Sequence, residues 1–203
     1  MKKILFLFLA ACFFFSCEKE TIVIPQQHAG RTVLAFFWAD NSLNSSLRNN
    51  IQTMMQGLQA MKDSAALLVY WDGEASDISW PEPCIVEYVT NGQGGINSLS
   101  KGTIDAMMAD KNTSIYDLIG IGNIRKNYPP QTSTEKTVMQ TVIGDMMSAY
   151  PSESYGIIFG SHGSGWLPTS TGTRSIGQDG GRYSSDTALI PELAEVLRTV
   201  NPL

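Results

Sequence analysis

Short apolar runs of strand length alternate with amphipathic helical patterns along most of this chain. The apolar runs span residues 32–38, 65–71, 84–90 and 155–159, with the length and branching of buried strands. Apolar residues recur every three or four positions over 43–61 and 138–147, and Pro191 suits the first turn of a last helix. Strands that alternate with helices predict an α/β fold with a mostly parallel sheet and helices on both faces.

The segments between these elements carry weaker signals. Residues 40–42, Asp-Asn-Ser, have the chemistry of a helix cap, and Thr132 with Glu135 predicts a capping box before the helix at 138–147. Residues 168–186 are rich in Gly, Ser and Thr and predict a long exposed loop. The run 115–121 fits neither a helix nor a strand clearly.

The segment Tyr-Gly-Ile-Ile-Phe-Gly-Ser-His-Gly-Ser-Gly-Trp, residues 155–166, places a histidine directly after a predicted core strand. The apolar run stops at Gly160, and His162 follows on a glycine-rich loop, where α/β folds carry their chemistry. The chain has two histidines, and the other, His28, lies in a polar lead-in. His162 is therefore the candidate acid–base group of an enzyme. The pattern alone leaves open a structural histidine held by hydrogen bonds.

Charge and cysteine content narrow the class of protein. The formal net charge is −5 and no basic run occurs, so a nucleic-acid-binding surface is not expected. Of the three cysteines, only Cys84 lies in the predicted domain, which excludes a disulfide framework and zinc sites of the Cys/His type. Cys84 opens an apolar run, where a small buried side chain is the expected role.

The N-terminal residues 1–17 read as a lipoprotein signal peptide. Two lysines precede an apolar stretch at 4–15 that is too short for a membrane span. Cys12 and Cys17 both follow small residues, and we favour lipidation at Cys17, because it uses the whole apolar stretch and leaves charge at the new N-terminus. Ordinary cleavage by signal peptidase is the alternative, and either route exports the protein. Residues 18–31 then form a polar tether, and 32–203 the folded domain.

Three segments resemble one known family, in the same order along the chain. Residues 33–43, Val-Leu-Ala-Phe-Phe-Trp-Ala-Asp-Asn-Ser-Leu, are similar to the first strand and turn of clostripain-type cysteine peptidases. Residues 155–166 resemble the catalytic-histidine strand of that family, with its His-Gly-x-Gly-Trp signature, and residues 189–193, Leu-Ile-Pro-Glu-Leu, resemble the helix that follows.

This resemblance implies a caspase-like three-layer αβα sandwich and a Cys/His dyad that hydrolyses peptide bonds after Arg or Lys. By position, His162 is the general acid and base, and Gly163 supplies an N–H group to the oxyanion hole. Trp166 is expected to support the loop. The resemblance also implies an accompanying Ca²⁺, to which Asp179 and Asp186 are the candidate contributors, with exposed turn aspartates as the alternative.

The chain departs from the family pattern at the nucleophile. In the family, the catalytic cysteine follows the Pro-Glu-Leu helix on the next strand, whereas this chain ends at Leu203 and has no cysteine after His162. Cys84 matches no family position. We therefore expect an incomplete domain, the histidine-bearing portion, that is inactive without a C-terminal segment of the same peptidase. Arg174 and Arg182 are candidate sites of self-cleavage, with solvated loop arginines as the alternative.

A second class of function stays open at this point. The chain could be a degenerate surface lipoprotein that binds peptide or glycan without cutting. Trp71, Trp80 and Trp166 suit glycan stacking if they are exposed, although aromatic residues near strand ends usually belong to the core. In either class the membrane is reached through the lipid anchor only, in the outer membrane or facing the periplasm.

Overall fold

A computed structural model describes residues 29–63, 65–73, 82–110, 112–163, 175–178 and 187–200. The sheet takes shape from five strands in the order β4-β3-β2-β1-β5. Their bounds are β1 Ala29–Ala39, β2 Ala65–Gly73, β3 Cys84–Val89, β4 Asn123–Asn127 and β5 Ser152–Gly160. β1 pairs in parallel with β2 and with β5, and β3 runs antiparallel to both of its neighbours. Four of these five strands therefore share one direction, and β3 is reversed.

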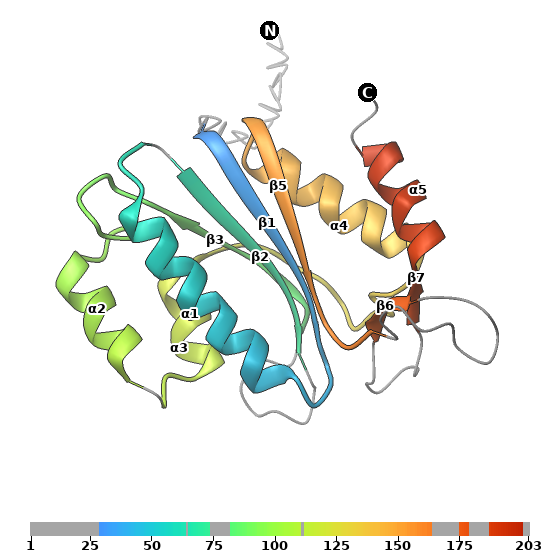
Figure 1. Cartoon of the computed structure of the whole chain (residues 1–203), viewed down its shortest axis with the longest axis horizontal. Helices are drawn as coiled ribbons and strands as arrows, with labels where there is room; N and C mark the ends of the chain where they lie inside the picture. Colours follow the sequence, from blue (N-terminus) through green and yellow to red (C-terminus); the bar gives the residue numbers. More distant parts are fainter. Residues whose placement is uncertain are drawn as a thin grey trace, which may run out of the picture.

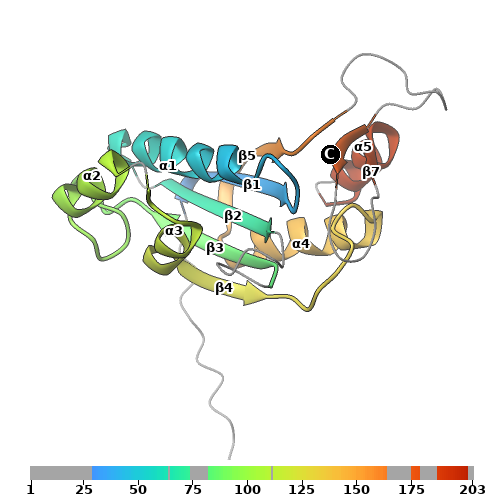
Figure 2. The same ribbon diagram turned by 90° about the horizontal axis from the view of Figure 1, so that it is seen from below.

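Helices cover both faces of this sheet (Figures 1 and 2). The helices α1 Asn44–Ala60, α2 Lys101–Ala109 and α3 Ile115–Ile121 lie on one face. The helices α4 Lys136–Ala149 and α5 Ile190–Val200 lie on the other. The predicted α/β fold, with a mostly parallel sheet between two helical layers, is confirmed.

The sheet separates two cores because successive strand residues point to opposite faces. In β1, Phe37 packs under α1 while Phe36 and Trp38 face α4 and α5. Helix α1 forms because its apolar stripe recurs with the helical period, and it buries Leu47, Ile51, Met55 and Leu58 against the first core. Trp71 is buried in the same core, at 1% exposure, so the expectation of an exposed Trp71 for glycan stacking is wrong.

Several expectations at element boundaries are wrong. No Thr132–Glu135 capping box forms; Glu135 is the N-cap of α4 without a side-chain cap bond. Residues 115–121 form α3, whose capping box joins Ser114 and Asp117. The predicted loop at 168–186 contains the strand β6, Ser175–Gln178, which pairs with β7, Thr187–Leu189. Glycine and serine content indicated a loop, but the ladder with β7 orders this piece.

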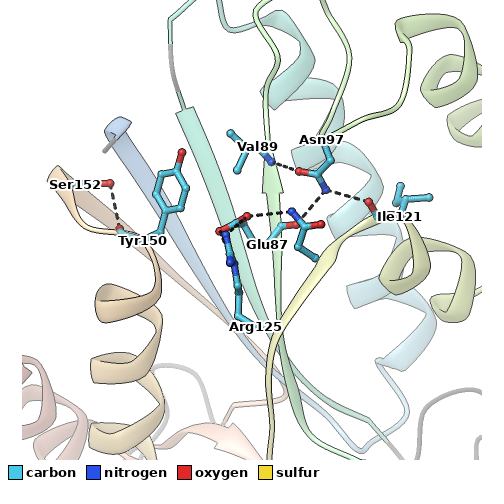
Figure 3. Close-up of polar contacts among 8 residues, drawn as sticks. Glu87, Val89, Asn97, Ile121, Arg125, Tyr150 and Ser152 are labelled. Carbon is cyan, nitrogen blue, oxygen red and sulfur yellow. Dashed lines mark hydrogen bonds and ion pairs between the residues drawn. The ribbon is translucent and has the colours of Figure 1, made fainter. Parts of the chain in front are cut away.

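The strands β5 and β4 form the two edges of the sheet. β5 lies at one edge, where Ile158 is 43% exposed, so the expectation that the run 155–159 is buried is wrong. β4, at the other edge, is tied to β3 by the fully buried carboxylate of Glu87. Arg125 donates to this carboxylate from Nε at 2.8 Å and from Nη2 at 2.7 Å (Figure 3). Asn123 donates to it at 3.2 Å. Within the described residues no helix is both long and apolar enough to cross a membrane.

Candidate active site

The carboxyl ends of β1 and β5 meet at one edge of the sheet because the two strands are parallel neighbours. Phe37 pairs with Gly160, so the segments that leave both strands emerge side by side. The segment after β1 turns into α1 through Asn41 and Ser42, and the segment after β5 carries His162. Residues 120 positions apart in sequence are thereby brought together.

Asn41 ties three segments at this edge. Its side-chain amide donates to the carbonyl of Trp38 at 2.7 Å, to the hydroxyl of Ser161 at 3.3 Å and to the carbonyl of Gln178 at 3.2 Å. Its oxygen Oδ1 accepts from the backbone N–H of Leu43 at 2.9 Å. Leu43 is the N-cap of α1 and has no side-chain cap bond, so the expected Asp-Asn-Ser cap is wrong. Asn41 instead fixes the turn and links it to β5 and β6.

His162 reaches across to this turn. Its Nε2 lies 2.9 Å from Oγ of Ser42, in an exposed hydrogen bond. Within the described residues, no hydrogen bond is formed by Nδ1 of the ring. The imidazole is thus held through Nε2 at the carboxyl edge of the sheet, where it is half-buried.

Two glycines on either side of His162, Gly160 and Gly163, allow neighbouring segments to pack closely against the chain. A Cβ on Gly160 would lie 2.6 Å from Cδ1 of Phe37 and 2.7 Å from Cδ2 of Leu47, so only glycine fits between β1 and α1. A Cβ on Gly163 would lie 3.1 Å from the carbonyl oxygen of Ser175, which shows that β6 passes directly beside this loop. The absence of a side chain at Gly160 and Gly163 lets Phe37 and Leu47 pack against the end of β5 and lets the backbone of β6 pass beside the loop that carries His162.

Buried aromatic packing supports the same edge from below. Trp38 stacks on Phe159, with ring centroids 5.6 Å apart, and its Nε1 donates to the carbonyl of Ser133 at 2.9 Å. The hydroxyl of Ser133 donates to the carboxylate of Asp72 and lies 2.6 Å from the hydroxyl of Tyr70. The ends of β1, β2 and β5 are therefore locked to the segment that precedes α4.

Cys84 is not part of this arrangement. It is fully buried at the start of β3, in the core beneath α1 to α3. β3 is separated from β5 by β2 and β1, so three strand spacings of about 4.8 Å place it roughly 14 Å away. The structure therefore does not bring Cys84 and His162 together as a dyad.

The remaining predicted site residues lie outside the described residues: Cys12, Cys17, His28, Trp80, Trp166, Arg174, Asp179, Arg182 and Asp186. In the part of the chain that is described, no group of three His, Cys, Asp or Glu side chains could hold a metal ion.

Sequence reasoning missed Asn41, Ser42, Ser161 and Gln178 as site residues. Their bonds depend on the adjacency of β1 and β5 and on the return of β6, and neither pairing is encoded locally. One signal was present: polar residues directly after two apolar strands meet at one edge if those strands are parallel neighbours.

Two solved structures of cysteine proteases are similar to this chain. A solved structure of a secreted C11 cysteine protease from Bacteroides thetaiotaomicron, bound to an irreversible peptide inhibitor, is similar with a TM-score of 0.58 and 25% identity, over 86% of this chain. This chain spans 40% of the length of that protein. A B. fragilis cysteine protease matches with a TM-score of 0.48 and 28% identity, over 69% of this chain and 94% of that one.

No curated protein matches the chain significantly. The sequence profile of the clostripain family, in contrast, matches residues 35–203, which include the β1–α1 turn and the segment that bears His162. The chain belongs to the clostripain family of cysteine peptidases.

Proposed function

We propose that this chain is the histidine-bearing part of an exported cysteine endopeptidase, in which His162 is the general acid and base. The observation that carries the proposal is the half-buried imidazole at the carboxyl edge of the sheet, bonded to Ser42 across two parallel strands. Membership of the clostripain family supplies the reaction class. Peptides or proteins are the proposed substrates.

The proposed chemistry uses His162 in both halves of the reaction. A cysteine thiolate attacks the carbonyl carbon of the scissile bond, and the oxyanion that forms accepts the N–H of Gly163. The protonated imidazole gives its proton to the departing amine as the C–N bond breaks, leaving a thioester. The neutral imidazole then takes a proton from water, which attacks the thioester and releases the acid product. In support, no hydrogen bond within the described residues engages the amide of Gly163.

The sulfur in this proposal comes from a further C-terminal segment of the same peptidase. Cys84 is an unsuitable source because it is buried about three strands away. The outer edge of β5 has no partner strand within the described residues, and Ile158 is 43% exposed there. A strand paired with this edge would run directly beside His162 and could carry the thiol at its end. The chain alone is then inactive.

Specificity, processing and location complete the proposal. Cleavage after Arg or Lys, and self-cleavage after Arg174 or Arg182, rest on the family resemblance. Export is supported by the N-terminal signal pattern and by the secreted state of the similar protein from B. thetaiotaomicron. We propose that Cys17 carries the lipid anchor, so that the protein stays at the cell envelope.

The test begins with the DNA that follows codon 203. We expect an open reading frame that continues into a strand ending in Asp-x-Cys. The polypeptide extended by this segment should cleave Arg- and Lys-containing peptides, and the 203-residue chain should not. His162→Gln in the extended protein should lower kcat by about 10²–10⁴-fold, the usual contribution of a general acid–base group.

The matched control is Cys84→Ser, which should leave activity unchanged. Cleavage by the 203-residue chain, abolished by Cys84→Ser, would overturn the proposal. Binding of peptide or glycan without any cleavage, and without an effect of His162→Gln, would instead indicate a non-catalytic surface lipoprotein.

A further inference from the structure

We infer that Ser42 is a positioning residue: it fixes the ring of His162 through Nε2 and assigns Nδ1 as the nitrogen that exchanges protons with the catalytic sulfur. This inference rests on the proposed function of His162. It adds to the site a residue that lies 120 positions before His162, in the turn between β1 and α1.

The Ser42 hydroxyl is presented by a rigid turn. The residue before it, Asn41, is bonded to Trp38, Ser161 and Gln178, and the residue after it is bonded to Oδ1 of Asn41. Asn44 then donates from its side-chain amide to the carbonyl of Ala39 at 3.2 Å. The backbone on both sides of Ser42 is therefore fixed, although Ser42 itself is exposed.

The histidine side of the contact is anchored as firmly. Ser161, the residue before His162, both donates to the carbonyl of Gln178 at 3.1 Å and accepts from its N–H at 3.0 Å. Gly160 is enclosed by Phe37 and Leu47, so the end of β5 cannot shift toward α1. Two anchored backbones thus meet at the 2.9 Å contact between Ser42 and His162. A contact built this way is pre-organised, as a catalytic orientation requires.

Proton accounting assigns the two ring nitrogens. When the ring is protonated, both nitrogens are donors, so Ser42 accepts from Nε2–H and Nδ1–H is available for the departing amine. For Nδ1 to take the thiol proton beforehand, the neutral ring must keep its proton on Nε2. In the inferred arrangement, Ser42 stabilises that tautomer by accepting the hydrogen bond from Nε2–H.

Nitrogen-15 NMR of the 203-residue chain tests the tautomer without any need for peptidase activity. Selective labelling of histidine gives signals from two rings only, and His28→Gln identifies those of His162. We expect a protonated Nε2 and an unprotonated Nδ1 in the neutral ring. Ser42→Ala should produce a mixture of tautomers, and Ser42→Thr should restore the original pattern. A protonated Nδ1 in the unaltered chain, or an unchanged pattern in Ser42→Ala, would overturn the inference.

Kinetics of the extended polypeptide supply the second readout. Ser42→Ala should lower kcat about tenfold with little change in KM, since it removes one orienting hydrogen bond and no substrate contact. Ser42→Thr should recover most of the loss, and Ser46→Ala, at an exposed position of α1, is the matched control. Equal kcat in Ser42→Ala and Ser46→Ala would refute the positioning role. An extended protein without any activity, but with the expected tautomer, would refute only the proposed peptidase function.

Discussion

The two edges of the sheet are built in opposite ways. β4 is five residues long, contains Arg125 and Lys126, and has a register irregularity against β3. β5 is nine residues long and carries the apolar residues Ile157, Ile158 and Phe159 just before it ends at Gly160, with Glu153 as its charged residue. Short, charged and irregular edges resist the addition of another strand, whereas a long apolar edge accepts one.

The charges at the β4 edge are neutralised internally. Glu87 is 1% exposed, and its carboxylate is held by Arg125 (Figure 3) and by Asn123. Lys126 pairs with Asp145 of α4 at 2.5 Å. The charged side chains of the β4 edge are therefore paired within the molecule, whereas the β5 edge, which carries His162, offers an apolar surface. This difference agrees with our proposal that a further strand pairs with the edge that carries His162.

The largest expected effect on stability concerns the β4 edge. Arg125→Ala removes the main partner of a buried carboxylate, and we expect a loss of about 3 kcal/mol in the free energy of unfolding, at the lower end for a broken buried pair because Arg125 is 25% exposed. Urea unfolding measures the change. Lys101→Ala, which breaks an exposed pair with Asp105, is the control and should cost far less. Equal losses in the two variants would contradict the account of this edge.

Gly160→Ala tests the packing at the end of β5. The added methyl would collide with Phe37 and Leu47, and overpacking of this kind costs about 1–3 kcal/mol. The matched control is Gly156→Ala in the same strand, where nothing lies within 4 Å of the added Cβ. We expect a lowered urea midpoint for Gly160→Ala alone. Similar midpoints for both variants would show that β5 is not clamped against β1 and α1.

Ile158 and Ile124 allow a direct comparison of the two edges, since each is 43% exposed. Replacing either with Lys should change the free energy of unfolding by no more than about 0.5 kcal/mol. Sedimentation velocity should show that the 203-residue chain associates as its concentration rises. Ile158→Lys should weaken this association, and Ile124→Lys should not. Equal weakening by both would mean that the edges do not differ in strand addition.

The smallest effect concerns α3, which leads into β4. The hydrogen bonds from Ser114 lower the pKa of Asp117 below its ordinary 3.8. A carboxyl with a depressed folded-state pKa stabilises the fold above its unfolded-state pKa, and this contribution disappears as the pH falls through the folded-state value. Asp117→Asn should therefore lower the melting temperature slightly at pH 7 and have less effect at pH 2. A pH-independent difference between the two proteins would contradict the capping role.

The sequence predicted the α/β class and the position of His162 because both depend on local patterns. Apolar runs and helical periodicity set the strands and helices, and glycine after an apolar run set the end of β5. The run 155–159 was predicted to be buried, and this was wrong, because the apolar composition of a run does not by itself show how far its strand is covered.

Features that depend on distant partners were not predictable. β4, with the sequence Asn-Ile-Arg-Lys-Asn, has little intrinsic strand preference and forms through its ladder with β3 and the bond between Arg125 and Glu87. Ser42 was interpreted as part of a helix cap, since its contact with His162 exists only once β1 and β5 are neighbours.

Labelling with a peptide electrophile that ends in Arg or Lys tests the central claim most directly. Such a probe forms a bond with the catalytic sulfur, and peptide mapping by mass spectrometry locates the modified cysteine. The account predicts that the 203-residue chain stays unlabelled, and that the extended polypeptide is labelled on a cysteine after residue 203 only while His162 is intact. A label on Cys84 of the 203-residue chain, lost in His162→Gln, would contradict it.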